Sequence, residues 1–303
     1  MLTPVLVVFI IYSVIVFSLI GKVNIVETEE RIAPSHEVYS SSSVRNILLI
    51  GTDSRGKDRG RSDSMIILSI NSSSDTISLV SLMRDTYVQI PGHGGAKLNA
   101  AYQYGGPELL MDTIEENFYI EVDEYFTVNF TSFASIVDTV GGVEMEISDA
   151  EADAINVLLD SKEGKKLFGT PKESDYLNGG GTYVLNGKQA LCYSRLRKVG
   201  NADFERTERQ RNVLEQIMKN LMSEPTAIFS NMGDILGELE TNMSKSSMYF
   251  MSLRLPFLLA GYEFEQMRIP AENAYAGSTI NGQSVLEFDK SKTLDMIEKD
   301  LYE

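Results

Sequence analysis

Acidic and basic side chains stand together at the ends of three short apolar runs of the sequence. Each lies within four residues of such a run: Asp53, Arg61, Asp63 and Arg84. Arg61 and Asp63 are two positions apart, so in an extended segment they share a face. Open α/β sheets bind ligands beyond the ends of their strands, so we expect the four side chains at one sheet edge. The ordinary alternative is a hairpin loop whose charges only keep it solvated.

Two of these side chains, Asp53 and Asp63, are carboxylates that would repel each other at one sheet edge unless positive charge lay between them. A hard divalent cation is one solution, because Mg²⁺ in proteins commonly takes one or two carboxylates together with phosphate oxygens. Asp53 and Asp63 are therefore candidate Mg²⁺ ligands.

A second charged group lies far along the chain, between residues 188 and 211. It holds seven lysines and arginines and only three acidic residues, although the whole chain has a formal net charge of −16. Arginine presents a planar fork of donors that suits two phosphate oxygens at once. This local excess of positive charge therefore indicates a site for an anion.

Four residues of this group are candidate anion ligands. Arg195 and Arg197 share a face if their segment is extended. Arg206 and Gln210 share a face near the start of a predicted helix, where backbone N–H groups favour an anion and Asp203 is expected as the N-cap. The plainer alternative is a surface helix with ion pairs four residues apart. Taken with the two aspartates, the arginines predict a pyrophosphate site bridged by a metal.

Composition excludes several other functions. The chain has 303 residues with 43 acidic and 27 basic side chains, a balance that disfavours nucleic acid as a partner. Its single cysteine, Cys192, can form neither an intramolecular disulfide nor a cysteine metal cluster. Its two histidines disfavour a Ser-His-Asp triad and a multi-histidine zinc site.

The amino terminus carries a compartment signal. Residues 2–20 hold no charged side chain, and nineteen helical residues reach roughly 28 Å, about the thickness of a bilayer's hydrocarbon core. We therefore expect a transmembrane signal-anchor over residues 1–21, followed by a polar, serine-rich linker over residues 22–43. A cleaved signal peptide is the alternative, although no A-x-A-like site follows.

The rest of the chain, residues 44–303, reads as one α/β domain. Short apolar, β-branched runs predict strands at residues 46–50, 65–70, 77–82, 124–130, 143–147 and 264–270. Helical spacing predicts helices at 107–117, 132–140 and 206–221, and one from 244 that stops near Pro256. Strands mixed with helices of this length indicate a layered α-β-α domain with a central mixed sheet.

Seven stretches resemble, in the same order, motifs of the LytR-CpsA-Psr family. They are "NILLIGTDSR", "GRSDSMIILSI", "LVSLMRDTYVQIPGHG", "KLNAAYQYGGPEL", "VNFTSFASIVDTVGGV", "LNGKQALCYSRLR" and "DFERTERQRNVL". The match runs from about residue 46 to beyond residue 211, and the tail "RIPAENAYAGSTINGQSVLEFD" resembles the end of the family domain. Several independent motifs over most of the chain make this resemblance specific.

The resemblance implies a single-pass membrane phosphotransferase whose catalytic domain faces the cell wall of a bacterium. Such proteins move a glycopolymer from a polyprenyl-pyrophosphate carrier to peptidoglycan through a phosphodiester. The polymer is a teichoic acid, a capsular polysaccharide or another secondary glycan. It further implies that Asp53 and Asp63 hold Mg²⁺, and that the pyrophosphate is bound by Arg61, Arg84, Arg195, Arg197, Arg206 and Gln210. Asp63 is the candidate for taking the proton of the acceptor hydroxyl, with Arg61 and Arg84 beside it.

Two other functions fit the same residues. A hydrolase would release the sugar phosphate to water, because transfer and hydrolysis differ only in the nucleophile that reaches the phosphorus. A non-catalytic lipid-binding or regulatory anchor would hold the pyrophosphate without turning it over. The aspartate pair favours metal-assisted chemistry, since arginines alone would suffice to hold the anion.

Overall fold

The computed structural model describes residues 2–28, 30–52, 60, 62–197, 199–200, 202–223 and 236–303. Within these ranges only the backbone is described at residues 2–9, 11, 202, 222–223, 255 and 259–260. Two residues of the predicted site, Asp53 and Arg61, lie outside the described residues.

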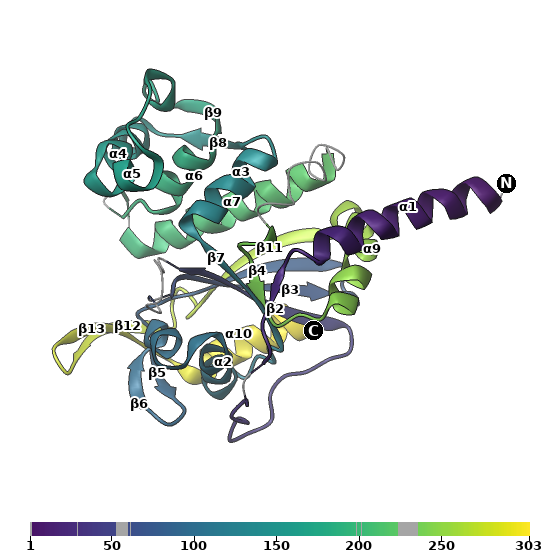
Figure 1. Ribbon diagram of the computed structural model, residues 1–303. Helices are drawn as coiled ribbons and strands as arrows, with labels where there is room; N and C mark the ends of the chain where they lie inside the picture. The colour runs from purple at the N-terminus through teal and green to yellow at the C-terminus, as the bar shows by residue number, and fades with distance from the viewer. Residues whose placement is uncertain are drawn as a thin grey trace.

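A mixed sheet forms the centre of the molecule (Figure 1). Its strands, in spatial order, are β1 (Asn24–Ile25), β10 (Glu240–Thr241), β7 (Glu124–Asn129), β2 (Val44–Thr52), β3 (Ser62–Asn71), β4 (Thr76–Leu82) and β11 (Glu263–Ile269). The pairs β2–β3 and β3–β4 are antiparallel, whereas β2–β7 and β4–β11 are parallel. The predicted α/β class with a central mixed sheet is confirmed.

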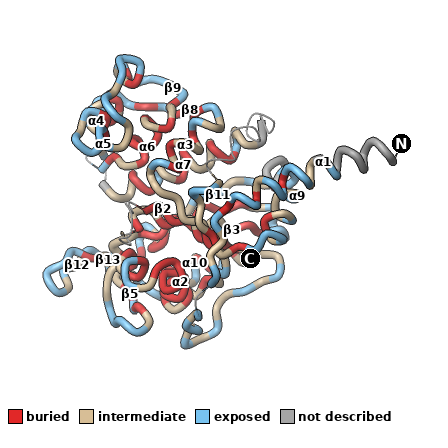
Figure 2. Tube along the Cα trace, in the orientation of Figure 1, coloured by how far each residue is buried: buried red, intermediate tan, exposed pale blue. Residues whose placement is uncertain are grey.

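The central strands are apolar on both sides because helices cover both faces of the sheet. In β2, Leu48 and Ile50 pack into the core beneath the sheet, while Ile47 and Leu49 pack on the opposite face. This is the arrangement that the nearly continuous apolar runs predict. Figure 2 shows the resulting band of buried residues through the sheet.

The lower layer consists of α2 (Leu98–Phe118), α10 (Lys290–Ile297) and a closing π-helical turn (Glu298–Tyr302). The helix predicted over 107–117 is the second half of α2, which begins nine residues earlier. Gly106 breaks the helical backbone with φ 75° and ψ −160°, because the residue before Pro107 is disfavoured in the α conformation. The proline thus begins a helix, as expected, but a shorter helical piece precedes it.

The upper layer consists of α7 (Ala202–Ser223), α9 (Lys245–Gly261) and the carboxyl-terminal half of α1 (Leu2–Ile20). The prediction that α9 stops at Pro256 is wrong. Proline cannot donate to the carbonyl four residues earlier, which belongs to Ser252. The Tyr12 hydroxyl from α1 donates to that carbonyl instead, at 2.9 Å.

A smaller lobe stands above the sheet and packs around its own core. It is built from α3 (Phe130–Thr139), β8 (Val143–Ile147), α4 (Asp149–Asp160), α5 (Lys162–Phe168), a 3-10 turn (Glu173–Asp175), β9 (Gly181–Leu185) and α6 (Gly187–Ser194). The strand predicted at 143–147 exists, but it pairs with β9 and stays apart from the central sheet. Two further hairpins are formed by β5 (Tyr87–Ile90) with β6 (Gly94–Lys97) and by β12 (Tyr275–Ile280) with β13 (Gln283–Phe288).

The segment expected to be a linker is held against α2. Arg31 forms ion pairs with the buried carboxylates of Asp112 and Glu115, the latter at 2.9 Å. Ser35 donates to Glu116 at 2.7 Å, and the backbone N–H of Tyr39 donates to the Tyr119 carbonyl at 2.7 Å. Part of this segment is therefore a strap fastened to the domain. Among the residues described, no helix combines the length and apolarity needed to cross a membrane.

Candidate functional site

Sheet register brings Asp63 and Arg84 together. Asp63 is the second residue of β3, and Arg84 lies two residues beyond the end of β4. The antiparallel ladder pairs Ile66 with Ser81, so the same register extended by three residues sets Asp63 opposite Arg84. The Arg84 Nη1 donates to the Asp63 carboxylate at 2.7 Å. The prediction that these two side chains share one sheet edge is confirmed.

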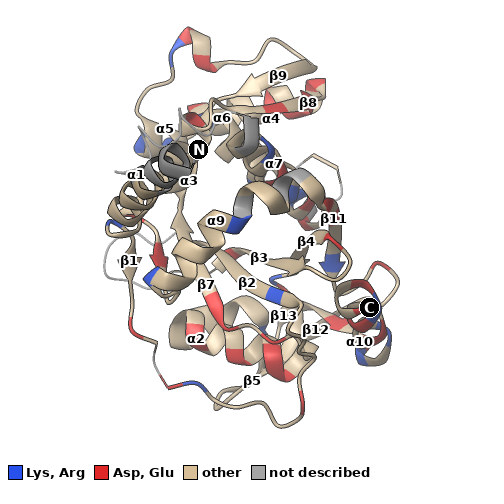
Figure 3. Cartoon of the chain, turned by 90° about the vertical axis from the view of Figure 1, so that its right-hand side faces the viewer, with Lys and Arg blue, Asp and Glu red and all other residues tan. Residues whose placement is uncertain are grey.

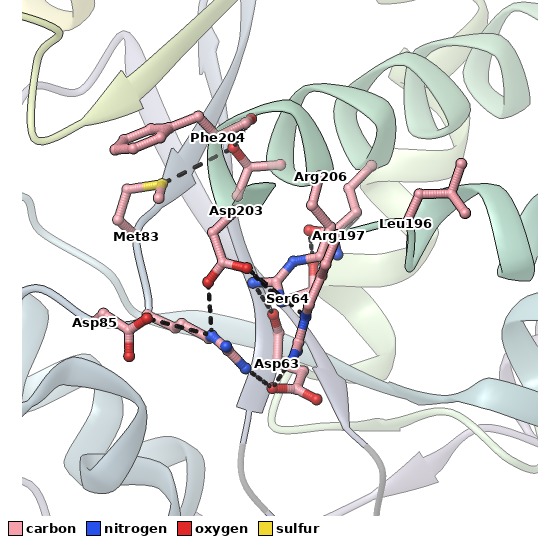
Figure 4. A network of polar contacts seen from close by, with 12 residues as sticks. Asp63, Ser64, Met83, Asp85, Leu196, Arg197, Asp203, Phe204 and Arg206 are labelled. Carbon is pink, nitrogen blue, oxygen red and sulfur yellow. Dashed lines mark hydrogen bonds and ion pairs between the residues drawn. The ribbon is translucent and has the colours of Figure 1, made fainter. Parts of the chain in front are cut away.

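The first turn of α7 completes the cluster with Asp203 (Figure 4). Its carboxylate accepts from the Arg84 Nε at 3.1 Å, and lies 3.2 Å from Arg206 and 3.7 Å from Arg197. The prediction that Asp203 is the N-cap is wrong, since α7 begins at Ala202. Sequence reasoning missed that this carboxylate gathers three arginines. One feature of the sequence could have indicated this role of Asp203: the local excess of arginines, which need carboxylates as counter-charges.

Arg206 is the most deeply buried member of the cluster, with its side chain 3% exposed. Burial lowers the pKa of its guanidinium to about 10, with Arg84 and Arg197 adding repulsion against the attraction of Asp203 and Asp63. In the part of the chain that is described, its Nε has no hydrogen-bond partner, and its Nη1 meets Asp203 as an ion pair without hydrogen-bond geometry. A buried cation with unused donors is suited to receive an anion.

Arg84 is held in its charged form. Burial alone lowers its pKa, but the carboxylates of Asp203, Asp63 and Asp85 outweigh burial, and the pKa is raised. Arg197 is more open, with its side chain 45% exposed and 3.6 Å from Asp63. The three arginines therefore approach the two aspartates from the sheet, from the segment after α6 and from α7.

Gln210 lies one turn beyond Arg206 and ties the site to its supports. Its amide oxygen accepts from the Ser64 hydroxyl at 2.9 Å, and its amide nitrogen donates to the Ser194 carbonyl at 3.3 Å. It joins β3, α6 and α7, so its placement beside the cluster agrees with the prediction from the sequence.

Arg195 points elsewhere. Helix α6 continues to Ser194, and Arg195 ends it with φ −107° and ψ 0°. The expectation that an extended segment places Arg195 and Arg197 on one face is therefore wrong. The Arg195 guanidinium lies 3.0 Å from Glu163 and 4.5 Å from the centre of the Phe130 ring. Among the contacts of the described residues, it has none with Asp63 or Asp203.

The arrangement is one that holds a phosphate-bearing anion. Three arginines and Lys97 face the three carboxylates of Asp63, Asp85 and Asp203, so the described cluster carries one net positive charge. For a metal, the ranges that the structure covers contain no group of three or more carboxylate, imidazole or thiol side chains able to hold one. Asp63 is the one predicted metal ligand described, and its side chain is 32% exposed.

A partly buried ion pair between Arg209 and Glu151 joins α7 to the smaller lobe at 2.8 Å, and its side chains are 6% and 14% exposed. Burial raises the pKa of Glu151, but the Ser148 backbone N–H and Arg209 outweigh it and hold the pKa below its ordinary 4.5. The predicted Glu205–Arg209 pair is also present, at 2.8 Å.

Replacing Arg209 by methionine is expected to lower the free energy of unfolding at pH 7 by about 2 kcal/mol, because it leaves the partly buried Glu151 carboxylate without its cation. The depressed pKa of Glu151 means that its stabilisation is complete above pH 4.5 and disappears as the pH falls below that value. The difference between the variant and the natural chain should therefore shrink in acid. Urea unfolding from pH 7 to pH 3 measures it. Lys219→Met, which breaks an exposed pair, is the matched control, with a change below about 0.5 kcal/mol.

Fold and site together define an α/β protein with an arginine-lined anion site at one edge of its central sheet. The chain belongs to the LytR_cpsA_psr family, whose model matches residues 14–301. This confirms the resemblance identified from the sequence motifs.

Relatives of known name agree with this membership. The chain is 35% identical over 255 residues to the polyisoprenyl-teichoic acid–peptidoglycan teichoic acid transferase TagU of Oceanobacillus iheyensis, covering 82% of this chain and 72% of the relative. It is 33% identical to the protein of the same name from Bacillus licheniformis, covering 83% and 75%.

Solved structures have the same fold. The structure of TagT bound to LI-WTA superposes with a TM-score of 0.69 at 27% identity, covering 92% of this chain and 99% of that chain. The structure of the LytR-CPS2A-psr family protein YwtF (TagT) with bound octaprenyl pyrophosphate lipid superposes with a TM-score of 0.65 at 25% identity, with the same coverage.

Proposed function

We propose that this chain transfers a glycopolymer from a polyprenyl-pyrophosphate carrier to peptidoglycan and joins the two through a phosphodiester. The observation that carries the proposal is the buried guanidinium of Arg206, which keeps an unused donor beside Arg84, Arg197 and the Asp63 carboxylate. The names of the relatives and the lipid bound to one solved family member support it. Those names favour a teichoic acid as the polymer over a capsular or other secondary polysaccharide.

In the proposed reaction, Arg84, Arg197 and Arg206 bind the pyrophosphate oxygens, with Arg61 and Gln210 beside them. Arg195, which the resemblance also assigns, is left out because it pairs with Glu163. An acceptor hydroxyl on peptidoglycan attacks the phosphorus that bears the glycan. The new P–O bond forms as the P–O bond to the bridging oxygen breaks, and polyprenyl phosphate leaves. The arginines stabilise the negative charge that moves onto the leaving phosphate.

Asp63 takes the proton of the acceptor hydroxyl in this account. In the free protein its carboxylate accepts a hydrogen bond from the Arg84 Nη1 at 2.7 Å. Phosphate oxygens that engage the same arginine fork would compete for that bond and leave Asp63 free to accept a proton. Binding of the donor would thus prepare the base.

We further propose that Asp53 and Asp63 bind Mg²⁺ together with the pyrophosphate oxygens. One described carboxylate suits this cation, which commonly takes one or two protein carboxylates and fills its remaining positions with phosphate and water oxygens. When bound, the ion would neutralise part of the charge on the phosphates. Transfer should then disappear in excess EDTA and return with added Mg²⁺. Full activity in EDTA would contradict this part of the proposal alone.

For location, we propose that α1 anchors the chain in the cell membrane through its amino-terminal half, which projects beyond the domain, with the catalytic domain on the wall side. The absence of charged side chains from this nineteen-residue helix supports the proposal. A carrier with a polyprenyl tail stays in the membrane, so an anchored enzyme meets its donor without leaving the bilayer.

The test uses the full chain in nanodiscs with Mg²⁺, a polyprenyl-pyrophosphate oligosaccharide and uncrosslinked peptidoglycan, with the products read by mass spectrometry. Sugar phosphate on peptidoglycan is the expected result, with none when the acceptor is omitted. Equal release of sugar phosphate to water with and without acceptor would instead make the chain a hydrolase. Tight donor binding without turnover would make it a binding protein.

A further inference from the structure

Exposed apolar side chains gather on α1 and α9. Ten large apolar side chains stand out as exposed among the residues whose side chains are described, and six of them lie on these two helices. On α9 they are Phe250 and Phe257, which are 63% and 78% exposed. These two positions are seven residues apart, about two helical turns, so they lie on one face. A concentrated patch of this kind marks a surface for a partner or a membrane.

The two helices are built to lie together. The Tyr12 hydroxyl of α1 donates at 2.9 Å to the Ser252 carbonyl that Pro256 leaves without its helical partner. The Phe17 ring of α1 stacks on the Tyr249 ring of α9 with centroids 4.5 Å apart. Figure 1 shows that α1 runs beside α9 and then projects beyond the domain. If the projecting end of α1 enters a membrane, α9 therefore lies at the surface of that membrane.

Charge on these helices is of one sign. Neither α1 nor α9 contains an acidic residue, and α9 carries Lys245 and Arg254, in a chain of net charge −16 (Figure 3). Both basic side chains are exposed. Arg254 also borders a small cavity of about 120 Å³ lined by Ser42, Ser43 and Arg45. Exposed phenylalanines with basic side chains on the same helix suit contact with a membrane surface that carries anionic lipid.

We propose that α9 lies in the headgroup region of the membrane, with Phe250 and Phe257 in contact with lipid and Lys245 and Arg254 beside the lipid phosphates. This inference rests on the proposed anchor, since α1 brings α9 to the bilayer. It goes beyond a tethered domain, because it fixes which face of the domain meets the membrane. In this arrangement the arginine site lies at one end of β2 and β3, whereas Arg45 and the cavity beside α9 lie at the other end.

The test is lipid quenching of a probe on the full chain in vesicles that contain anionic lipid. Separate Phe250→Cys and Phe257→Cys variants are labelled with an environment-sensitive fluorophore. Val157→Cys and Val184→Cys are the matched controls, because these valines are equally exposed, at 69% and 63%, on the smaller lobe. Burial raises the pKa of the Cys192 thiol to about 12, so the natural cysteine stays protonated and unlabelled.

Lipids with a quencher near the headgroup are expected to quench the probes at 250 and 257 several-fold more than those at 157 and 184. Equal quenching at all four positions in vesicle-bound protein would overturn the α9 proposal and leave the anchor and the transferase standing. A probe at 250 that is shielded without lipid-dependent quenching, and exposed again on dilution, would mean a second copy of the chain covers α9. Failure of the chain to float with vesicles would overturn both the anchor and the α9 proposal.

Discussion

Replacing Arg84 by alanine is expected to lower kcat/KM for transfer about 100- to 1000-fold, the usual cost of removing a charged group that stabilises a transition state. Arg84 is 19% exposed and bonds Asp63 at 2.7 Å and Asp203 at 3.1 Å. Without it the two carboxylates face the pyrophosphate with less positive charge between them. The donor should therefore bind more weakly and react more slowly, as single-turnover kinetics with labelled donor would resolve.

The matched control for Arg84→Ala is Arg45→Ala. Arg45 also pairs with a partly buried carboxylate, Glu124, at 2.5 Å, but near the opposite end of β2. A general loss of folding would affect both variants alike, which circular dichroism and urea unfolding would detect. A folded Arg84→Ala variant with the kinetics of Arg45→Ala would remove Arg84 from the site.

Replacing Asp63 by asparagine is expected to separate binding from chemistry. Loss of the proton acceptor should lower kcat about 100- to 10,000-fold, the range for a positioned general base. Binding should not weaken in parallel, because the variant removes a negative charge 2.7 Å from Arg84 and 3.6 Å from Arg197, the groups that receive the anion. Titration with a soluble polyprenyl-pyrophosphate analogue without Mg²⁺ measures binding, and single-turnover transfer with Mg²⁺ measures chemistry.

Glu124→Gln is the control for Asp63→Asn, since it also removes the carboxylate of an Arg–carboxylate pair in the central sheet. Near-natural kcat with Asp63→Asn would exclude Asp63 as the base. Retained kcat with weakened binding would instead make it a residue that only orients Arg84.

Much of the fold could be predicted from local patterns. The apolar runs that became β2, β3 and β4 are covered on both faces, so their signal is unbroken along the sequence. The residues at which helices end were harder to predict. The end expected for α9 at Pro256 failed because a hydroxyl from α1, some 240 positions away, replaces the lost hydrogen bond. Contacts at that sequence separation leave no trace in a local pattern.

The residues of the candidate site were likewise predictable only where local sequence patterns determine their positions. Asp63 and Arg84 were predictable because both follow from where strands begin and end. Arg195 was assigned to the same face as Arg197 on the assumption of an extended segment, but α6 reaches Ser194 and turns Arg195 toward Glu163. The local sequence predicts a helix cap at Asp203, because an aspartate at the start of a helix commonly is one. Only three-dimensional proximity to three arginines reveals its place at the centre of the cluster.

Position-specific labelling of the donor tests the central claim most directly. Two donors are prepared, one with ³²P in the phosphate next to the glycan and one with ³²P in the phosphate next to the polyprenyl chain. The full chain in nanodiscs is supplied with each donor, Mg²⁺ and uncrosslinked peptidoglycan. The account predicts that the glycan-side label enters peptidoglycan and that the lipid-side label stays in polyprenyl phosphate. Glycan-side label released into solution, or no movement of either label, would contradict it.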